Sequence, residues 1–299
     1  MQRKFGPGRS RNSQLLSEWG EPLHNEDHTN RSVHTALRTL AVVSLSLLAL
    51  GAAHAQALGK SLIVVAHPDD EYYVAATVYR LAMQLKAPVD ELVITNGEGG
   101  YRYSTLAESY YGLPLTEESV GRREMPTIRK QEALNAGRIL GIRNHYFLDQ
   151  KDEEFTTDIS EGLNRLWDSE FVTNFLVTLL HGEHYKYVFT VLPRATTHGH
   201  HQAATVLAVR AIRSLHKQER PVLLAADTDG SLYDALAAVP ESQVWAKAES
   251  FEFDRNIHFG FQNALSYQIV VSWMIAEHKS QGMFQTVFGK DGQEYFWVD

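Results

Sequence analysis

Apolar runs alternate with stretches of helical spacing along the chain from residue 61 onward. Short continuous apolar runs predict buried strands, and longer stretches in which apolar positions recur every three to four residues predict helices. The predicted strands are residues 61–66, 91–95, 145–148, 187–191 and 222–226. The predicted helices are residues 71–86, 122–140, 159–180, 201–215 and, in an aromatic-rich tail from residue 251, 267–279. This alternation predicts an α/β fold, in which a Rossmann-like, mostly parallel sheet carries helices on both faces of a single domain.

A long irregular stretch, residues 96–120, separates the second predicted strand from the second predicted helix. It contains three glycines close together and four tyrosines, which are Tyr101, Tyr103, Tyr110 and Tyr111. Loops of this length within a compact domain are usually functional or disordered. The tyrosines could stack on a bound ring or pack locally, and the sequence leaves both open.

The N-terminal segment has the pattern of an export signal. Residues 40–53 form 14 uncharged positions rich in Val, Leu and Ala, preceded by two arginines and followed by a small-x-small sequence at residues 53–55. These are the basic region, the apolar region and the cleavage site of a signal peptide. We therefore expect residues 1–55 to be a leader and signal peptide that is removed, residues 56–299 to form the mature domain, and the protein to be periplasmic or secreted.

Two alternatives for this segment are a retained membrane anchor and an ordinary cytosolic helix. An uncharged stretch of 14 residues is short for a hydrocarbon core of about 30 Å, so we expect no stable membrane span in the mature chain. The polar leader ahead of the signal is long, and translation starting near Val33 would explain it.

Composition narrows the possible partners and chemistry. The formal net charge of -8 argues against a nucleic-acid binder with a broad basic surface. The chain has no cysteine, which excludes a disulfide scaffold, a cysteine-ligated metal and a thiol nucleophile. Any metal ion must therefore be held by His, Asp, Glu or water, and the chain has 14 histidines.

A first polar cluster follows the first predicted strand, where residues 66–71 read AHPDDE. Ligands of open α/β sheets bind outside the carboxyl ends of the strands, so His67, Asp69 and Asp70 lie where chemistry is expected. The alternative is that an aspartate caps the next helix and Pro68 occupies its first turn.

A second cluster follows the fourth predicted strand, where residues 197–202 read THGHHQ. Two clusters at the carboxyl ends of two strands can converge in space. Two histidines and one carboxylate with an open fourth position are the ligand set of a hydrolytic zinc site. A solvated loop or adventitious metal binding would also explain the three histidines of this cluster.

These residues resemble the LmbE-like or PIG-L family of zinc-dependent de-N-acetylases, which act on N-acetylglucosamine conjugates. The resemblance covers roughly residues 61 to 281. It rests on six elements in order: AHPDDE at 66–71, a T-x-GE-x-G loop at 95–100, an R-x-x-E-x-x-x-A-x-x-x-LG helix at 129–141, FL-x-x-x-D at 147–152, H-x-x-H at 198–201 and H-x-SQ at 278–281.

The resemblance implies a role for each of five residues. His67, Asp70 and His201 are implied to hold one Zn²⁺ per chain, and Asp69 is implied to be the general base. His198 is implied to stabilise the oxyanion of the tetrahedral intermediate, with a share in general-acid catalysis as the alternative.

The sequence leaves the roles of four further candidate site residues open. Arg129 and Asp152 resemble substrate-binding positions for sugar hydroxyls or a phosphate, and a surface ion pair is the alternative for both. His200 stands where the family usually has another residue, so it rivals His201 as a metal ligand. His278 is either a site residue or a histidine at a helix C-terminus.

We therefore expect a metal-dependent amidohydrolase that removes an N-acetyl group from an N-acetylglucosamine-type amino sugar or its conjugate. Its partner would be a small-molecule or glycan substrate rather than a nucleic acid. The alternatives are a metal-dependent hydrolase of another amide, an ester or a phosphoester, and a non-catalytic carbohydrate-binding protein. The sequence does not specify the natural substrate or the oligomeric state.

Overall fold

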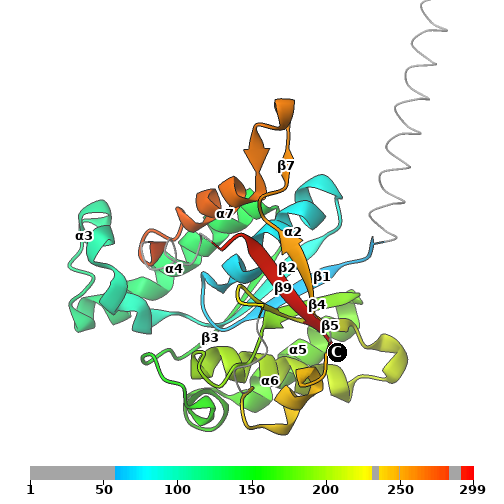
Figure 1. The fold of residues 1–299 in the computed structure, drawn as a ribbon. Coiled ribbons are helices and arrows are strands. Elements are labelled where there is room, and N and C mark those ends of the chain that lie inside the picture. The colour runs from blue at the N-terminus through cyan, green and yellow to red at the C-terminus, as the bar shows by residue number, and fades with distance from the viewer. Residues whose placement is uncertain (1–57, 231–235, 249, 283–290) are drawn as a thin grey trace, which may run out of the picture. The chain divides into compact units, whose positions relative to one another are not determined.

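Five parallel strands form most of a seven-stranded sheet in the computed structural model of the chain (Figure 1). They are β1 (Ser61–Val65), β2 (Val89–Thr95), β3 (His145–Gln150), β4 (Tyr187–Val191) and β5 (Val222–Asp227). Two further strands, β6 (Ser250–Asp254) and β9 (Gln293–Val298), extend the sheet beyond β5. The strand order is β3-β2-β1-β4-β5-β9-β6, and β9 runs antiparallel to both of its neighbours. The predicted mostly parallel α/β sheet is confirmed.

The structure describes residues 58–230, 236–248, 250–282 and 291–299. These residues belong to one compact unit. The predicted leader and signal peptide, residues 1–55, lie outside the described residues. Within the described part, no helix combines the length and the apolar character that crossing a membrane requires.

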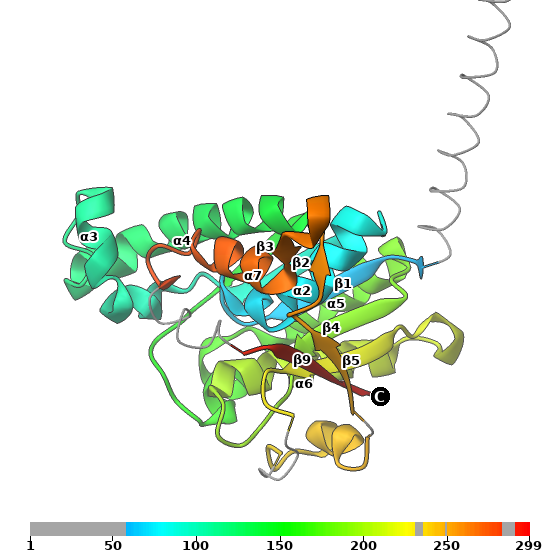
Figure 2. The ribbon, with the colours of Figure 1, turned by 45° about the horizontal axis from the view of Figure 1, so that its top comes forward.

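Helices cover both faces of the sheet (Figure 2). One face carries α2 (Ala75–Tyr79), α4 (Glu118–Leu140) and α7 (Tyr267–Ile275), which pack on one another. The other face carries α5 (Ser169–Glu183) and α6 (Gly199–Ser214). The shorter elements are α3 (Thr105–Tyr111), strands β7 (His258–Phe259) and β8 (Leu265–Ser266), 3-10 helices at Asp70–Val74, Glu98–Tyr103, Lys217–Glu219, Pro240–Trp245 and Phe261–Asn263, and π-helical segments at Arg80–Gln84 and Glu161–Leu166.

Each central strand is buried on both faces. In β1, Leu62 and Val64 pack in the core beneath α5 and α6, whereas Ile63 and Val65 pack in the core beneath α2, α4 and α7. A strand covered on both sides is apolar at nearly every position. This is the physical reason for the continuous apolar runs in the sequence.

The predicted helix over residues 159–180 was wrong as one continuous element. The π-helical segment ends at Leu166, and α5 begins only at Ser169. Between them the carboxylate of Asp168 accepts a hydrogen bond from the backbone N–H of Phe171 (2.9 Å). Because such a cap satisfies the first turn of a helix, it favours a new helix start at this point.

The loop and the tail contain more structure than the sequence indicated. Residues 96–120 contain a 3-10 helix and α3, and α4 starts at Glu118 rather than at residue 122. The tail helix ends at Ile275, and the tail also supplies β6 and β9. These two strands pair with each other and with β5, so tertiary pairing rather than a strong local pattern defines them.

The topology places the carboxyl ends of β1 and β4 side by side. From β1 the chain builds β2 and β3 on one side and then crosses to β4 and β5 on the other. The crevice between β1 and β4 is therefore a topological switch point, where open α/β sheets bind their ligands. Both predicted polar clusters follow these two strands.

Candidate active site

The turn after β1 holds the Asp70 carboxylate in place through the backbone. Oδ2 of Asp70 accepts hydrogen bonds from the backbone N–H groups of His67 (2.8 Å) and Ala66 (3.1 Å). Burial acts to raise the pKa of Asp70, but the neighbouring His201 and His67 outweigh burial and hold it well below its usual range. The side chain is therefore a fixed, ionised carboxylate.

The first turn of α6 orients the second cluster. Nδ1 of His198 accepts a hydrogen bond from the backbone N–H of His200 (3.0 Å), so a histidine serves as the N-cap of this helix. Nδ1 of His201 lies 3.3 Å from Oγ1 of Thr197, which leaves Nε2 of His201 directed toward Asp70.

His67, Asp70 and His201 form a group that fits a metal ion. Nε2 of His201 lies 3.0 Å from Oδ1 of Asp70 and 3.2 Å from Nδ1 of His67, and Nδ1 of His67 lies 3.5 Å from Oδ2 of Asp70. Three corners of a tetrahedron around zinc, with metal–ligand bonds of about 2.0–2.1 Å, are separated by about 3.3–3.4 Å. The two ring nitrogens and the Asp70 carboxylate, which approaches His201 through Oδ1 and His67 through Oδ2, therefore lie at separations close to those of zinc ligands.

The electrostatics of His67 agree with this fit. Burial acts to lower the pKa of His67, but the carboxylates of Asp152 and Asp70 raise it to about 10. The two carboxylates thus stabilise positive charge at the His67 ring. A proton on the ring supplies one positive charge, and a divalent cation would supply two.

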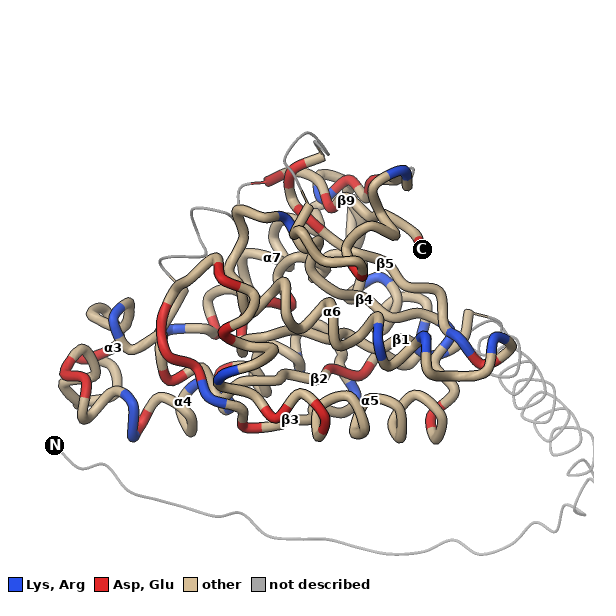
Figure 3. The backbone as a smooth tube through the Cα atoms, turned by 90° about the horizontal axis from the view of Figure 1, so that it is seen from below, with Lys and Arg blue, Asp and Glu red and all other residues tan. Residues whose placement is uncertain are grey.

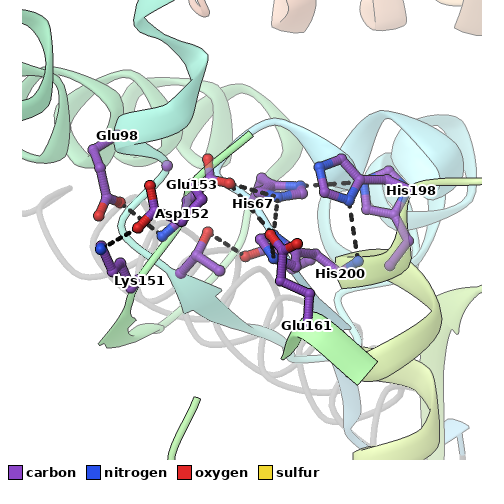
Figure 4. A network of polar contacts seen from close by, with 12 residues as sticks. His67, Glu98, Lys151, Asp152, Glu153, Glu161, His198 and His200 are labelled. Carbon is purple, nitrogen blue, oxygen red and sulfur yellow. Dashed lines mark hydrogen bonds and ion pairs between the residues drawn. The ribbon is translucent and has the colours of Figure 1, made fainter. Parts of the chain in front are cut away.

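A second group shares His67 and adds Asp152, His198 and His200 (Figure 4). Nδ1 of His200 lies 3.3 Å from Oδ1 of Asp152 and 3.3 Å from Nε2 of His67. The His200 ring is fully buried and does not line the pocket, whereas Asp70 and His201 both do. All three members of the first group therefore line the pocket, whereas the second group includes one residue, His200, that does not.

Asp69 belongs to neither of these groups and pairs with Arg129. Oδ2 of Asp69 lies 2.9 Å from Nη2 of Arg129, and both side chains are almost completely buried. Burial raises the pKa of Asp69 to about 6, and Arg129 opposes this rise. The backbone of Asp69 has φ 137°, a conformation that residues other than glycine rarely adopt. Such strain at a pocket residue is typical of a functional position.

Arg129 is buried, so its predicted alternative as part of a surface ion pair was wrong, and it links the turn after β1 to the loop after β2. Its guanidinium donates to the backbone carbonyls of Gly97 (2.9 Å) and Pro68 (2.7 Å) in addition to the Asp69 pair. Gly97 has φ 70°, and a Cβ atom there would lie 2.6 Å from Nη1 of Arg129. The glycine of the predicted loop motif is thus required both by its left-handed backbone and by the close approach of the arginine.

Asp152 is also buried, at 3% exposure, so its surface-pair alternative was wrong. Burial acts to raise its pKa, but His67 and His200 outweigh burial and hold it well below its usual range. The backbone N–H of Asp152 donates to Oε2 of Glu98 (3.0 Å), which fixes the loop that carries the aspartate.

His198 lies at the mouth of the site as a neutral ring. Burial, together with three neighbouring histidines, lowers the pKa of His198 to about 2. Because Nδ1 accepts a backbone hydrogen bond, the neutral ring carries its proton on Nε2. His198 is therefore a hydrogen-bond donor that does not carry a charge.

His278 lies behind the pocket. Its Nε2 is 2.5 Å from Oε1 of Glu71, and both side chains are fully buried. Glu132 holds the same C-terminal segment, because it accepts hydrogen bonds from the backbone N–H (2.9 Å) and the hydroxyl (2.6 Å) of Ser280. His278 does not line the pocket, and it lies three residues beyond the end of α7 at Ile275. Its contact with Glu71 instead stabilises the turn after β1 from behind the pocket.

The pocket above these groups has a volume of about 350 Å³. Its lining consists of His67, Asp69, Asp70, Tyr72, Tyr73, Gly99, Gly100, Tyr103, Arg129, Asp152, Glu154, Phe155, Thr196, Thr197, His198, His201 and Gln281. All seven predicted site residues belong to this lining. The sequence missed the aromatic residues Tyr72, Tyr73 and Phe155, because nothing in their local pattern distinguishes a pocket wall from ordinary packing.

Fold and site together define an α/β protein that carries a histidine–carboxylate cluster at the switch point of its sheet. A family model described as PIG-L, GlcNAc-PI de-N-acetylase, matches residues 62–212. The chain therefore belongs to the PIG-L family, as its sequence motifs indicated.

Two curated relatives are similar to the chain. A probable N-acetyl-alpha-D-glucosaminyl L-malate deacetylase 2 of Bacillus cereus is 27% identical over 164 residues, which is 55% of this chain and 66% of the relative. A probable deacetylase of the same name from Bacillus subtilis is 24% identical over 160 residues, which is 54% of this chain and 63% of the relative. The match thus spans slightly less than two thirds of each relative.

Among solved structures, the N,N'-diacetylchitobiose deacetylase from Pyrococcus horikoshii has a TM-score of 0.51 and 17% identity. The match covers 81% of this chain and 84% of the other. At this identity the similarity concerns the fold, and it agrees with the α/β architecture described above.

Proposed function

We propose that this protein is a zinc-dependent hydrolase that removes an N-acetyl group from an N-acetylglucosamine-type amino sugar or its conjugate. The observation that carries the proposal is the group of His67, Asp70 and His201, whose donor atoms have zinc-like spacing beside an aspartate outside that group. Family membership and the names of the curated relatives support the choice of an N-acetyl amide as the bond.

The three ligands would hold one Zn²⁺, which in such sites polarises a carbonyl and lowers the pKa of bound water to about 7. Asp69 is the proton carrier of this proposal. Its carboxylate, held by Arg129, accepts a proton from the attacking water and returns it to the departing amine nitrogen. The adjacent Asp70 would not share this task, because its carboxylate would hold the metal ion.

His198 stabilises the oxyanion in this scheme. A neutral ring with its proton on Nε2 can donate a hydrogen bond to the oxygen on which negative charge develops. Because Nδ1 already accepts the backbone N–H of His200, the proton on Nε2 is the one that can reach a substrate oxygen, which supports the donor role over a share in general-acid catalysis.

Asp152 lines the pocket and can accept a hydrogen bond from a sugar hydroxyl, in line with its predicted substrate-binding role. Arg129 contacts substrate less directly in this proposal, because its guanidinium already serves Asp69 and two backbone carbonyls. Its part is to position Asp69 at the floor of the substrate site.

We also propose that the protein acts after export and removal of residues 1–55. This rests on the charge and hydrophobicity pattern of the N-terminal segment, which supplies the three regions of a signal peptide.

The function is tested with zinc-loaded mature protein and a panel of N-acetylated amino sugars. We expect equal amounts of free acetate and new primary amine, lost on chelation and restored by zinc. Hydrolysis of an ester or a phosphoester without amide turnover would support another metal-dependent hydrolase instead. Saturable sugar binding without product would indicate a carbohydrate-binding protein.

A further inference from the structure

The pocket that surrounds the proposed zinc site is acidic. Among the described residues that line it are four carboxylates, Asp69, Asp70, Asp152 and Glu154, and a single arginine or lysine, Arg129. One zinc ion at the site would offset two of these charges, Arg129 offsets the charge of Asp69, and Arg102 pairs with Glu154, so each described charge of the lining has its own counter-charge. Figure 3 shows acidic positions gathered along the chain between α3 and α6.

Arg129 cannot readily meet an anion brought by a substrate. The residue is 3% exposed, and both of its terminal nitrogens donate to backbone carbonyls, those of Gly97 and Pro68. Its charge is balanced by Asp69 at 2.9 Å. Binding a substrate anion would require breaking these contacts, which would also release the proposed base.

The basic residues near the pocket rim are paired with acidic neighbours. Nη2 of Arg102 lies 3.3 Å from Glu154, and Nη2 of Arg122 lies 3.2 Å from Glu153. Lys151 also pairs with Glu153. These three basic side chains of the described rim each have an acidic partner, so none of them carries an uncompensated positive charge toward a ligand.

Two aromatic side chains flank the mouth instead. Tyr103 is 49% exposed and Phe155 is 62% exposed, and both line the pocket. The ring of Phe155 lies 5.1 Å from the ring of His198, so it stands directly beside the proposed oxyanion donor. Exposed aromatic faces at a pocket mouth are suited to stacking on a neutral, partly apolar ring such as a sugar.

We propose that the group attached to the N-acetylglucosamine unit of the substrate is uncharged, and that it is a second sugar or a similar neutral ring held by Tyr103 and Phe155. This inference rests on the proposed function. It distinguishes the substrate of this chain from the malate conjugates in its relatives' names, because a malate group carries two carboxylates and the described residues of this pocket offer them no uncompensated arginine or lysine.

The test compares substrates that share the same sugar and differ in charge. N-acetyl-α-D-glucosaminyl L-malate is compared with its dimethyl ester, and amine release is followed for both. We expect the ester to be turned over with a kcat/KM about tenfold or more above that of the free malate, since the two carboxylates of the malate would lose water without gaining a cationic partner among the described lining residues. Added salt should narrow this difference.

Equal or greater turnover of the charged malate would overturn the inference and leave the proposed function intact. If neither compound releases an amine, and N,N'-diacetylchitobiose releases none either, the proposed function itself fails. The two failures are therefore distinguishable.

Variants test the aromatic mouth. Tyr103→Ala and Phe155→Ala should each lower kcat/KM for N,N'-diacetylchitobiose about tenfold, and change that for methyl N-acetylglucosaminide much less. Trp273→Ala is the matched control, because Trp273 is 61% exposed on α7 and is not part of the pocket lining. Equal losses on the two substrates would overturn the assignment of these rings to a second sugar.

Glu154→Gln tests the charge. Removing this carboxylate should raise kcat/KM for the free malate and leave that for its dimethyl ester nearly unchanged. If Glu154→Gln changed kcat/KM for the free malate and for its dimethyl ester by the same factor, the electrostatic basis of the preference for an uncharged substrate would be contradicted.

Discussion

Asp69 and Asp70 are adjacent in sequence and have different environments. Asp70 points into the histidine group and is tied by two backbone N–H groups, whereas Asp69 pairs with Arg129 and has its pKa raised to about 6, chiefly by burial. The strained backbone at Asp69 separates the two side chains. One carboxylate can therefore bind a metal while its neighbour carries a proton.

The first prediction separates these two residues. Asp69→Asn should keep zinc bound and lower kcat by about 10²–10⁴-fold with little change in KM, because a positioned base is lost and no ligand is. Asp70→Asn should instead weaken zinc binding and recover part of its activity in excess zinc. Elemental analysis and steady-state rates measure both effects.

Asp149→Asn is a suitable control, because Asp149 lies outside the pocket lining and its side chain is 56% exposed. A metal-free Asp69→Asn protein, or one with a rate near that of the wild type, would overturn the proposed division of labour.

The second prediction concerns the two histidine groups. His67→Ala, Asp70→Ala and His201→Ala should each sharply lower the bound zinc, because a three-ligand site has no spare protein ligand. His200→Ala should keep its zinc, although the buried ring packs 5.0 Å from Trp167 and its loss should lower the melting temperature.

Metal content is measured alongside thermal unfolding, so that loss of fold is not mistaken for loss of a ligand. The opposite pattern, in which His200→Ala and Asp152→Asn lose zinc and Asp70→Asn keeps it, would place the ion in the second group.

At the scale of elements, β2 carries a buried carboxylate that the site does not use. Glu91 is fully buried, and neither of its carboxylate oxygens makes a hydrogen bond. Nε2 of His145 on β3 lies 3.2 Å away, but burial lowers the pKa of His145, so this ring is not a charged partner. Burial, followed by repulsion from Glu71, raises the pKa of Glu91 well above its usual range.

The third prediction is that Glu91→Gln stabilises the protein, and more so at higher pH. The folded chain keeps Glu91 protonated while the unfolded chain ionises it above pH about 4.3, so stability falls as the pH rises from there toward the folded pKa. Glutamine has the same size and does not ionise, so the gain in unfolding free energy should be clear at pH 8 and small at pH 4. Denaturant unfolding at several pH values measures it.

A gain that is independent of pH would contradict the protonated state of Glu91. Glu252→Gln on the edge strand β6 is a matched control, because this glutamate is exposed and should show no such dependence.

At the scale of the whole molecule, the fourth prediction concerns processing. The mature protein should begin at or near Gln56, because small residues occupy the positions that signal peptidase requires at residues 53 and 55. N-terminal sequencing of protein recovered from an exporting host tests this directly, and a chain that begins at Met1 would contradict it.

Much of the fold was predictable because it depends on local pattern. The five parallel strands were found from short apolar runs, since a strand covered on both faces is apolar at most of its positions. The break before α5 and the antiparallel strands β6 and β9 were not found. They depend on one capping side chain and on pairing with distant strands, and neither leaves a periodic signal.

The sequence by itself determined which residues follow which strands. Because the carboxyl ends of parallel strands share one edge of the sheet, His67, Asp70 and His201 could be placed together from strand positions and motifs alone. The predicted pocket residues all lie at that edge.

Only the tertiary structure decided how these side chains are used. It pairs Arg129 with Asp69 across 60 positions of sequence, buries Asp152 against His67, and sets His278 behind the site against Glu71. These contacts join segments far apart in the chain, and they depend on strand order, burial and rotamer rather than on local spacing. For that reason the sequence identified the members of the site, whereas packing determined the charge, the partner and the accessibility of each one.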